Sequence, residues 1–281
     1  MTPQQPDIYQ YKSYLFTIAY NMVGEIPAAE DLVQDTFEKW LKSDTANVTQ
    51  VKAYLSRILI NSAIDKLEKL KKEREAYKGV WLPQPLITND PLQEEYTLEY
   101  AMIFLLERLN PYERAVFLMK EVFAFPHPEI ATTLNISAEN CRQILHRAKD
   151  KVRSPAKLLE ADLLKQQDLL DAFLLAVYQK DFDKLKDIFL KDIVMYQDGG
   201  GKIAAALKPI SGWGKISKFL DGVLRLDPDA VFDIKPVLIN GGRGILVLRG
   251  GLPDSILAID VEEQKISKLF LLRNPDKILQ Q

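Results

Sequence analysis

Cysteine and histidine are scarce in this sequence, and long apolar runs are absent from it. Its 281 residues include one cysteine and two histidines. A lone cysteine cannot form an internal disulfide, which fits a reducing compartment, and so few thiol and imidazole ligands argue against a metal site. No apolar run approaches the roughly 20 residues of a membrane span, and the N-terminus lacks the features of a signal peptide. We therefore expect a cytoplasmic protein with no membrane contact, no metal and no other cofactor.

The net charge is also small, at −2 for the whole chain. This balance argues against a uniformly basic nucleic-acid binder, but it leaves room for local basic faces, which decide phosphate contact. The length suits two or three domains. We predict boundaries that divide the chain into the segments 1–78, 79–91, 92–153 and 154–281.

Helical periodicity dominates the first segment. Residues 9–41 predict two helices separated by a break at 24–27, and a long helix is expected from about Val51 to Ala76. Residues 52–78 hold eight Lys or Arg and four Asp or Glu. This local excess can neutralise phosphates. The alternative interpretation of the basic C-terminal end of this long helix is a solvated helix terminus, since Lys favours the C-terminal end of a helix.

The segment 79–91 changes character. It contains Trp81, Pro83 and Pro85 within an apolar run, and proline disfavours helix both at its own position and at the preceding one. We therefore expect an extended interdomain linker that docks on another part of the protein.

A helix-turn-helix pattern follows, after a strong helix start at Asn110-Pro111-Tyr112-Glu113. Ser137 is placed to N-cap the second helix of the pattern. Inward positions carry apolar or small side chains, namely Ile130, Ala131, Leu134, Ile136, Cys141 and Ile144. Outward positions of the second helix can bond base edges or phosphates in a major groove, and they hold Glu139, Asn140, Arg142, Gln143, His146 and Arg147. Cys141 is expected to be a buried small hydrophobe rather than a redox sensor.

The periodicity changes again beyond Ser154-Pro155. Helices are expected at 161–179, 182–189 and 216–226, and strands near 193–196, 231–239, 245–248, 255–260 and 266–272. Helices followed by an antiparallel meander indicate an α+β domain.

Three glycines lie between the acid and the base of Asp198-Gly199-Gly200-Gly201-Lys202. A phosphate-binding P-loop would need Gly-Lys followed by Ser or Thr, which this segment lacks. A tight hairpin or bulge is the simpler interpretation. We expect a turn whose backbone lets another segment approach closely, either the Trp81 linker or the 1–78 domain.

Residues 9–153 resemble the extracytoplasmic-function sigma factors of bacterial RNA polymerase. Residues 31–37 (DLVQDTF) resemble the part of sigma region 2 that grips the clamp helices of the largest polymerase subunit. Residues 54–66 resemble the helix that faces the −10 promoter element. Residues 109–117 and the helix-turn-helix resemble region 4, which reads the −35 element. These stretches occur in the order that the family has.

The rest of the chain resembles one subgroup, whose members carry a SnoaL-like, NTF2-fold C-terminal extension. Residues 81–86 (WLPQPL) resemble its linker motif, which usually has Glu where Gln84 stands, and residues 198–202 match its glycine-rich motif. In that subgroup the extension is thought to regulate the sigma factor from within the same chain. The implied fold is an all-α region 2 and region 4 followed by an α+β NTF2-like domain.

The resemblance implies partners and site residues. The partners are promoter DNA and core RNA polymerase, through its clamp helices and its upstream-promoter-facing flap. The resemblance implies that Asp31, Gln34 and Asp35 bind the polymerase. The alternative is that they form an ordinary exposed acidic helix face. Contact with the −10 element falls to Lys52, Arg57 and Asn61, with the loop 44–50 as a candidate for capturing an unstacked base. The regulatory residues are Trp81, Leu82, Pro83, Asp198, Gly199, Gly200, Gly201 and Lys202.

Two other functions remain open. The chain fits, less well, a helix-turn-helix regulator with a ligand-sensing or vestigial enzymatic NTF2-like domain, although such a regulator needs no region 2. An enzyme would need a general acid or base in an apolar cavity, and the candidates Tyr178, Tyr196, Asp198 and Asp260 form no evident dyad. We therefore expect no enzymatic activity. A small-molecule ligand of the C-terminal domain, and the sign of its regulation, stay open.

Overall fold

The computed structural model describes residues 7–46, 48–88, 97–152, 162–226 and 232–278. It divides into two compact units. The first comprises residues 1–75, 92–98 and 102–159, and the second comprises residues 76–91, 99–101 and 160–281. The linker thus belongs to the same unit as the C-terminal segment. Within the described ranges, none of the helices is long and apolar enough to cross a membrane.

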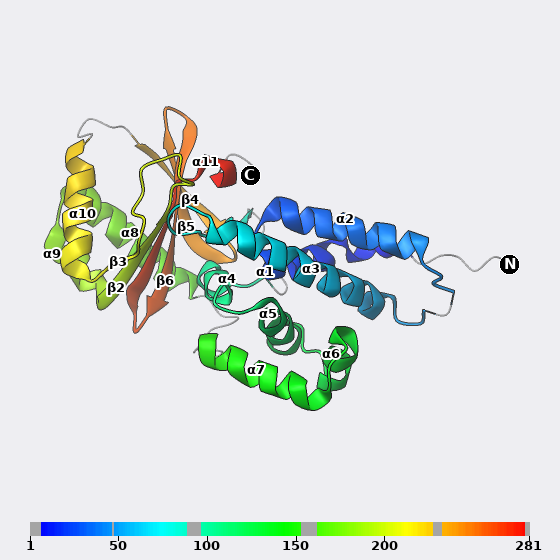
Figure 1. The fold of residues 1–281 in the computed structure, drawn as a ribbon. Helices are drawn as coiled ribbons and strands as arrows, with labels where there is room; N and C mark the ends of the chain where they lie inside the picture. The colour runs from blue at the N-terminus through cyan, green and yellow to red at the C-terminus, as the bar shows by residue number, and fades with distance from the viewer. Residues whose placement is uncertain (1–6, 47, 89–96, 153–161, 227–231, 279–281) are drawn as a thin grey trace. The chain divides into compact units, whose positions relative to one another are not determined.

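Three packed helices form the N-terminal part of the first unit (Figure 1). They are α1 (Lys12–Val23), preceded by a 3-10 turn (Ile8–Tyr11), α2 (Ile26–Lys42) and α3 (Val51–Glu75). Gly24 ends α1 with a left-handed φ of 73°, and its N–H bonds the Tyr20 carbonyl at 2.8 Å. These helices and the break at 24–27 confirm the sequence prediction.

The rest of the first unit contains the helix-turn-helix. After α4 (Tyr100–Leu106), the chain forms α5 (Pro111–Phe117), a π-helical turn η3 (Leu118–Val122), α6 (His127–Leu134) and α7 (Ala138–Val152). The predicted start of α5 is confirmed, because Asn110 and Glu113 form a reciprocal capping box. The beginning of the segment predicted to span 92–153 falls outside the described residues.

The second unit is an α+β domain, as predicted. Its sheet has the order β1-β4-β5-β6-β7-β2-β3. The strands are β1 (Ile87–Thr88), β2 (Phe189–Asp198), β3 (Ile210–Ser211), β4 (Phe232–Ile239), β5 (Gly242–Arg249), β6 (Leu252–Glu262) and β7 (Lys265–Leu272). Helices α8 (Leu163–Gln179), α9 (Phe182–Ile188) and α10 (Trp213–Leu226) lie along the sheet (Figure 1), and their apolar side chains share one core with it. A short α11 (Pro275–Ile278) follows β7.

The sheet departs from a simple antiparallel meander in two ways. Strands β4 to β7 do form the predicted meander, but β2 pairs with β7 in parallel. The linker also contributes strand β1, which pairs with the end of β4. The glycine-rich segment is a turn rather than a hairpin: the Lys202 and Ile203 N–H groups bond the Gly199 carbonyl, and the chain pairs again only at Ile210.

Candidate functional site

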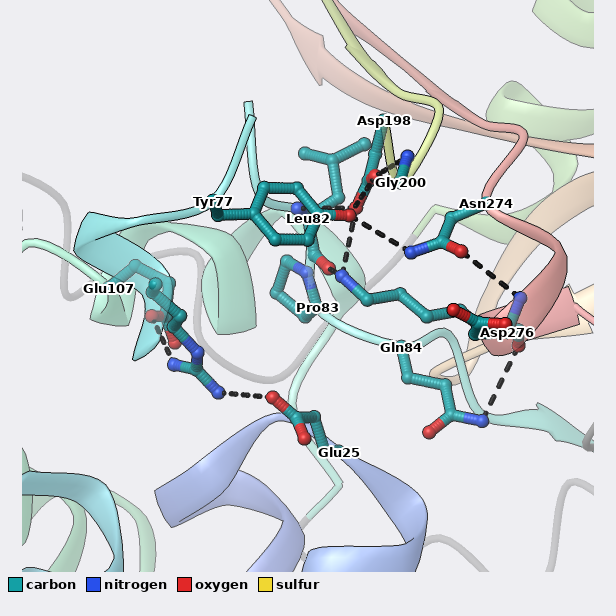
Figure 2. Close-up of polar contacts among 12 residues, drawn as sticks. Glu25, Tyr77, Leu82, Pro83, Gln84, Glu107, Asp198, Gly200, Asn274 and Asp276 are labelled. Carbon is teal, nitrogen blue, oxygen red and sulfur yellow. Dashed lines mark hydrogen bonds and ion pairs between the residues drawn. The ribbon is translucent and has the colours of Figure 1, made fainter. Parts of the chain in front are cut away.

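The carboxylate of Asp198 is the centre of the most connected polar cluster in the second unit (Figure 2). It lies at the end of β2 and is only 1% exposed. It accepts hydrogen bonds from the N–H of Leu82 at 3.0 Å, from the N–H of Gly200 at 2.9 Å and from the Tyr77 hydroxyl. It also pairs with the Lys277 ammonium at 2.8 Å. A buried carboxylate is stable only when its lone pairs are satisfied in this way.

Lys277 completes the contact with the linker. Its ammonium donates to the carbonyl of Leu82 and lies 4.2 Å from the centre of the Trp81 ring. Asp198 and Lys277 together therefore bind both backbone polar groups of Leu82. The side chain of Leu82 is fully buried.

Asn274 forms the outer side of the cluster. Its side-chain amide donates to the Tyr77 hydroxyl at 2.9 Å, and its carbonyl oxygen accepts from the Asp276 N–H at 3.0 Å. Gly200 has a left-handed φ of 66°, and a Cβ placed there would lie 2.6 Å from Cγ of Asn274. Glycine is thus required at this position. Burial, followed by the hydrogen bond to Asp198, raises the pKa of Tyr77, which keeps this hydroxyl protonated.

Further contacts fix the linker along its length. The Pro83 carbonyl accepts from the Tyr100 hydroxyl at 2.8 Å, and Gln84 donates to the Lys277 carbonyl at 3.4 Å. Leu86 exchanges hydrogen bonds with Asn240, at 3.0 Å through the Asn240 side chain and at 2.9 Å through its backbone N–H. The linker is therefore fixed from Tyr77 to strand β1.

The predicted regulatory residues fall into two groups. Trp81, Leu82, Pro83, Asp198 and Gly200 come together in this cluster. Lys202 instead forms an exposed ion pair with Asp276 at 2.6 Å. A Cβ on Gly199 would lie 2.1 Å from the Ile203 carbonyl oxygen, so Gly199 serves the turn itself, and Gly201 is exposed. The sequence interpretation missed Tyr77, Asn274 and Lys277, for which only the Asn274-Pro275 helix start gave a local signal.

The predicted −35 residues lie on the exposed side of α7. The N-cap is confirmed, since the Asn140 N–H donates to the Ser137 hydroxyl at 3.1 Å. The remaining predicted side chains are all exposed, namely Glu139, Asn140, Arg142, Gln143, His146 and Arg147. Cys141 is buried as expected, and burial raises the pKa of its thiol.

The predicted −10 residues lie on α3, and two of them, Arg57 and Asn61, lie beside the helix-turn-helix of the same unit. Lys52 lies 3.8 Å from the centre of the Tyr14 ring. Asn61 donates to the Thr133 carbonyl at 3.3 Å. A cavity of about 720 Å³ is lined from one side by Arg57 and Asn61 and from the other by α6 and α7, including Asn140 and Arg147. The structure thus brings predicted −10 and −35 residues to one cavity.

The predicted polymerase-binding residues Asp31, Gln34 and Asp35 are all exposed on α2. Among the described residues, Asp31 forms a distant ion pair with Lys66, at 4.0 Å. An exposed pair of this kind contributes little to stability. These side chains are therefore available to a basic partner.

The candidates for enzymatic acid–base chemistry either form contacts with other side chains and backbone groups or are exposed to solvent. Asp198 is taken up by the linker cluster, and Asp260 pairs with Lys268. Burial works to lower the pKa of Lys268, but Asp260 outweighs it and raises that pKa, so the ammonium of Lys268 stays charged. Tyr196 stacks on Phe270, and Tyr178 is 87% exposed.

Comparisons with known proteins agree with the division of the first unit into an N-terminal helical part and a helix-turn-helix part. The model of Sigma-70 region 2 matches residues 8–73, and that of Sigma-70 region 4 matches residues 101–152. The ECF RNA polymerase sigma factor SigJ of Mycobacterium tuberculosis is 29% identical over 95% of this chain and 90% of its own length. The probable ECF RNA polymerase sigma factor SigI of the same species is 26% identical over 95% of this chain and 92% of its own length.

A solved structure extends the similarity to the whole fold. The crystal structure of M. tuberculosis SigJ superimposes with a TM-score of 0.78 at 26% identity, covering 96% of this chain and 98% of that one. These relatives are named as sigma factors rather than as enzymes. The chain is thus a homologue of the extracytoplasmic-function sigma factors, with Sigma-70 regions 2 and 4 followed by an α+β extension.

Proposed function

We propose that this chain binds core RNA polymerase and directs promoter-specific initiation, and that its C-terminal domain controls initiation by holding the linker between regions 2 and 4. The sigma-factor assignment is supported by regions 2 and 4 occurring in order and by relatives that match nearly the whole chain. Asp31, Gln34 and Asp35 then bind the clamp helices, and the flap contacts region 4. A cytoplasmic location follows from the location of the polymerase. We assign no catalytic role to the extension.

The observation that carries the regulatory part is the binding of the Leu82 backbone by Asp198 and Lys277. These contacts bind the linker, which is the segment that joins the two promoter-reading regions. Roughly 24 residues separate α3 from α4, and such a segment spans about 80 Å when fully extended. Docking of the linker on the C-terminal domain can only shorten the distance that this segment spans.

The required reach is large. The −10 and −35 elements lie about 25 base pairs apart, or about 85 Å along a duplex at about 3.4 Å per base pair. We propose that the docked linker restrains regions 2 and 4 and that its release favours the promoter-bound arrangement. The extension thereby acts as an inhibitor built into the same chain.

The experiment is in-vitro transcription with core polymerase and the Asp198→Asn variant. Asn keeps the size of the side chain but loses the charge that pairs with Lys277, and breaking a buried pair costs about 3 kcal/mol or more. We expect initiation to increase several-fold over the unchanged protein. Asp276→Asn is the matched control. It removes the exposed ion pair between Asp276 and Lys202, and Lys202 belongs to the same 198–202 motif as Asp198. Reduced initiation by Asp198→Asn would mean that docking is needed for activity.

A second function is favoured by no specific observation. A helix-turn-helix regulator that acts without polymerase would bind promoter DNA alone and would not bind core polymerase. A pull-down with core polymerase separates it from the proposed function. Mass spectrometry of the purified protein tests for a small molecule carried by the extension.

A further inference from the structure

A cavity of about 330 Å³ lies beside the glycine-rich turn of the second unit, and we call it the turn cavity. It is lined by residues 78–80 at the start of the linker, by Gln197 near the end of β2, and by residues of the loop 199–207. Its volume is at the lower end of the range of about 300–1,000 Å³ that ligand pockets have. Among the described residues, Asp198 and Lys277 do not line it. The turn cavity is therefore distinct from the cluster that holds Leu82.

Gln197 is a polar side chain at a core-facing position. Alternate residues of a strand point to the same side of the sheet. Ile193 and Met195, which precede Gln197 on that side of β2, both belong to the apolar core of the unit. Gln197 is itself only 3% exposed. Because a buried amide is costly unless its polar atoms are bonded, we expect Gln197 to serve a role other than packing.

The contacts of the Gln197 amide with other described residues leave donor capacity for a ligand. Its Oε1 accepts a hydrogen bond from the Ala206 N–H at 3.1 Å, which fixes the direction of the amide. Its Nε2 lies 3.1 Å from Sδ of Met195. An amide nitrogen carries two N–H groups, and a thioether is a weak acceptor. Gln197 can therefore donate a hydrogen bond to an oxygen atom held in the turn cavity.

The exposed part of the lining is positively charged. Lys78 and Lys202 both line the turn cavity, and both are exposed. Lys202 pairs with Asp276, whereas Lys78 forms no ion pair with any of the described residues. The described lining residues also include no Asp or Glu. A cleft lined by charge of one sign attracts the opposite charge, so an anion is favoured here.

The rest of the lining is apolar, and much of it is small. It consists of Gly79, Val80, Gly199, Gly201, Ile203, Ala204, Ala205, Ala206 and Leu207. Such residues leave room for a short carbon chain and offer it apolar contacts. The turn cavity thus combines an anion-binding part, a short apolar part and a buried hydrogen-bond donor.

We propose that the turn cavity binds a short oxo acid and that the bound acid holds the linker in its docked position. The carboxylate of the acid lies at Lys78, and its oxo oxygen accepts the hydrogen bond from Gln197. Both polar groups are needed, because the two protein groups differ in charge and in burial. The apolar chain of the acid lies against the alanines of the loop.

The effect on the linker follows from where the lining comes from. Residues 78–80 belong to the linker, and they lie against the loop: a Cβ on Gly79 would lie 3.5 Å from Cδ2 of Leu207, and a Cβ on Gly201 would lie 3.5 Å from Cβ of Lys78. Release of the linker removes these residues from the turn cavity. A ligand that binds only the docked arrangement stabilises it by mass action.

This inference rests on the proposed role of the linker, but binding itself is measured on the full-length protein without polymerase. Levulinate is the probe, because it carries a carboxylate and a ketone on a short chain. We expect it to bind with a Kd on the order of 1 mM, as suits so small a ligand. Valerate lacks the ketone and methyl levulinate lacks the charge, so each should bind at least fivefold more weakly. Saturation-transfer NMR measures all three.

Gln197→Leu removes the buried donor and leaves an apolar side chain at a core-facing position. We expect it to weaken levulinate binding at least tenfold and to leave valerate binding unchanged. Gln166→Leu is the matched control, because Gln166 is also buried and its Oε1 also accepts a backbone N–H, from Arg243 at 2.7 Å, but it does not line the turn cavity. Equal losses of levulinate binding in the two variants would overturn the role of Gln197.

Lys78→Met tests the anion-binding part at an exposed position, where folding is not at risk. It should weaken the binding of levulinate and of valerate to the same extent, by at least fivefold. Lys208→Met is its control, because Lys208 is an exposed lysine that follows the loop and does not line the turn cavity.

Hydrogen exchange at the Leu82 amide measures the effect of the ligand on the linker. Levulinate at about ten times its Kd should slow this exchange about tenfold, because it binds only the docked arrangement. Absence of levulinate binding, equal binding of the three probes, or unchanged exchange at Leu82 would overturn the inference. If levulinate binds and slows this exchange but leaves in-vitro transcription unchanged, the site is supported and the proposed inhibition by the docked linker is contradicted.

Discussion

The backbone N–H of Leu82 donates a hydrogen bond to Asp198 Oδ2 across 3.0 Å, although 116 positions separate the two residues in the sequence. Leu82 belongs to the linker between regions 2 and 4, and Asp198 ends a strand of the extension. This contact makes the linker part of the C-terminal domain. The regulation proposed above depends on it.

The glycine at position 200 should be needed for this docking. In Gly200→Ala the left-handed backbone costs about 1 kcal/mol, and the new Cβ collides with Asn274. We expect faster proteolysis of the linker and altered promoter output without unfolding of the extension. Gly212→Ala is the control, because Gly212 has a similar φ of 83° but nothing within 4 Å of the new Cβ. If both variants behave alike, the glycine-rich segment is only a turn.

Arg142 is predicted to read the −35 element. It is exposed on the recognition helix, and a bidentate contact to a guanine contributes about 1–3 kcal/mol of discrimination. Arg142→Ala should lower −35-dependent transcription about tenfold or more and leave polymerase binding intact. Transcription from promoters with altered −35 bases is the measurement. Unchanged promoter selectivity would remove Arg142 from the reading set.

Asp31 and Asp35 are predicted to dock on basic residues of the clamp helices. Reversing both to Lys should weaken holoenzyme assembly severely, and binding of the unchanged protein should fall with added salt. A pull-down with core polymerase measures both effects. Glu68→Lys/Glu73→Lys applies the same charge change on exposed positions of α3. Equal losses in the two double variants would indicate a general charge effect instead of a docking site.

Glu113 should make the stability of region 4 depend on acid pH. Burial works to raise its pKa, but hydrogen bonds from Lys151 and from the Asn110 N–H outweigh burial and lower it. A lowered pKa means that the contribution is present above the ordinary value of about 4.3 and is lost as the pH falls below it. Urea unfolding between pH 7 and about 3.5 should show a loss of about 1–2 kcal/mol that Glu113→Gln lacks. Identical pH profiles of stability for the unchanged protein and for Glu113→Gln would contradict this role of Glu113.

Local features of the fold could be predicted from the sequence. The helix-turn-helix was placed correctly because its signals are local: the Ser137 cap, the Asn110 capping box and the spacing of inward residues such as Ile130 and Cys141. The meander β4 to β7 followed from the strand-like runs near 231–239, 245–248, 255–260 and 266–272. Exposure of the recognition residues followed from the same periodicity.

Long-range features could not be predicted in this way. The parallel pairing of β2 with β7, and the strand β1 that the linker adds beside β4, depend on segments far apart in the chain. The roles of Tyr77 and Lys277 depend on the same folding, because each residue has an ordinary sequence context. The apolar linker was expected to dock, yet its partners within the extension became identifiable only in the structure.

The rate of hydrogen exchange at the Leu82 amide tests the central claim most directly. The claim predicts strong protection of this amide in the free protein, because its acceptor is a buried carboxylate, and much faster exchange in the promoter-bound holoenzyme, where the linker is released. Exchange that is equally slow in both states would contradict the account.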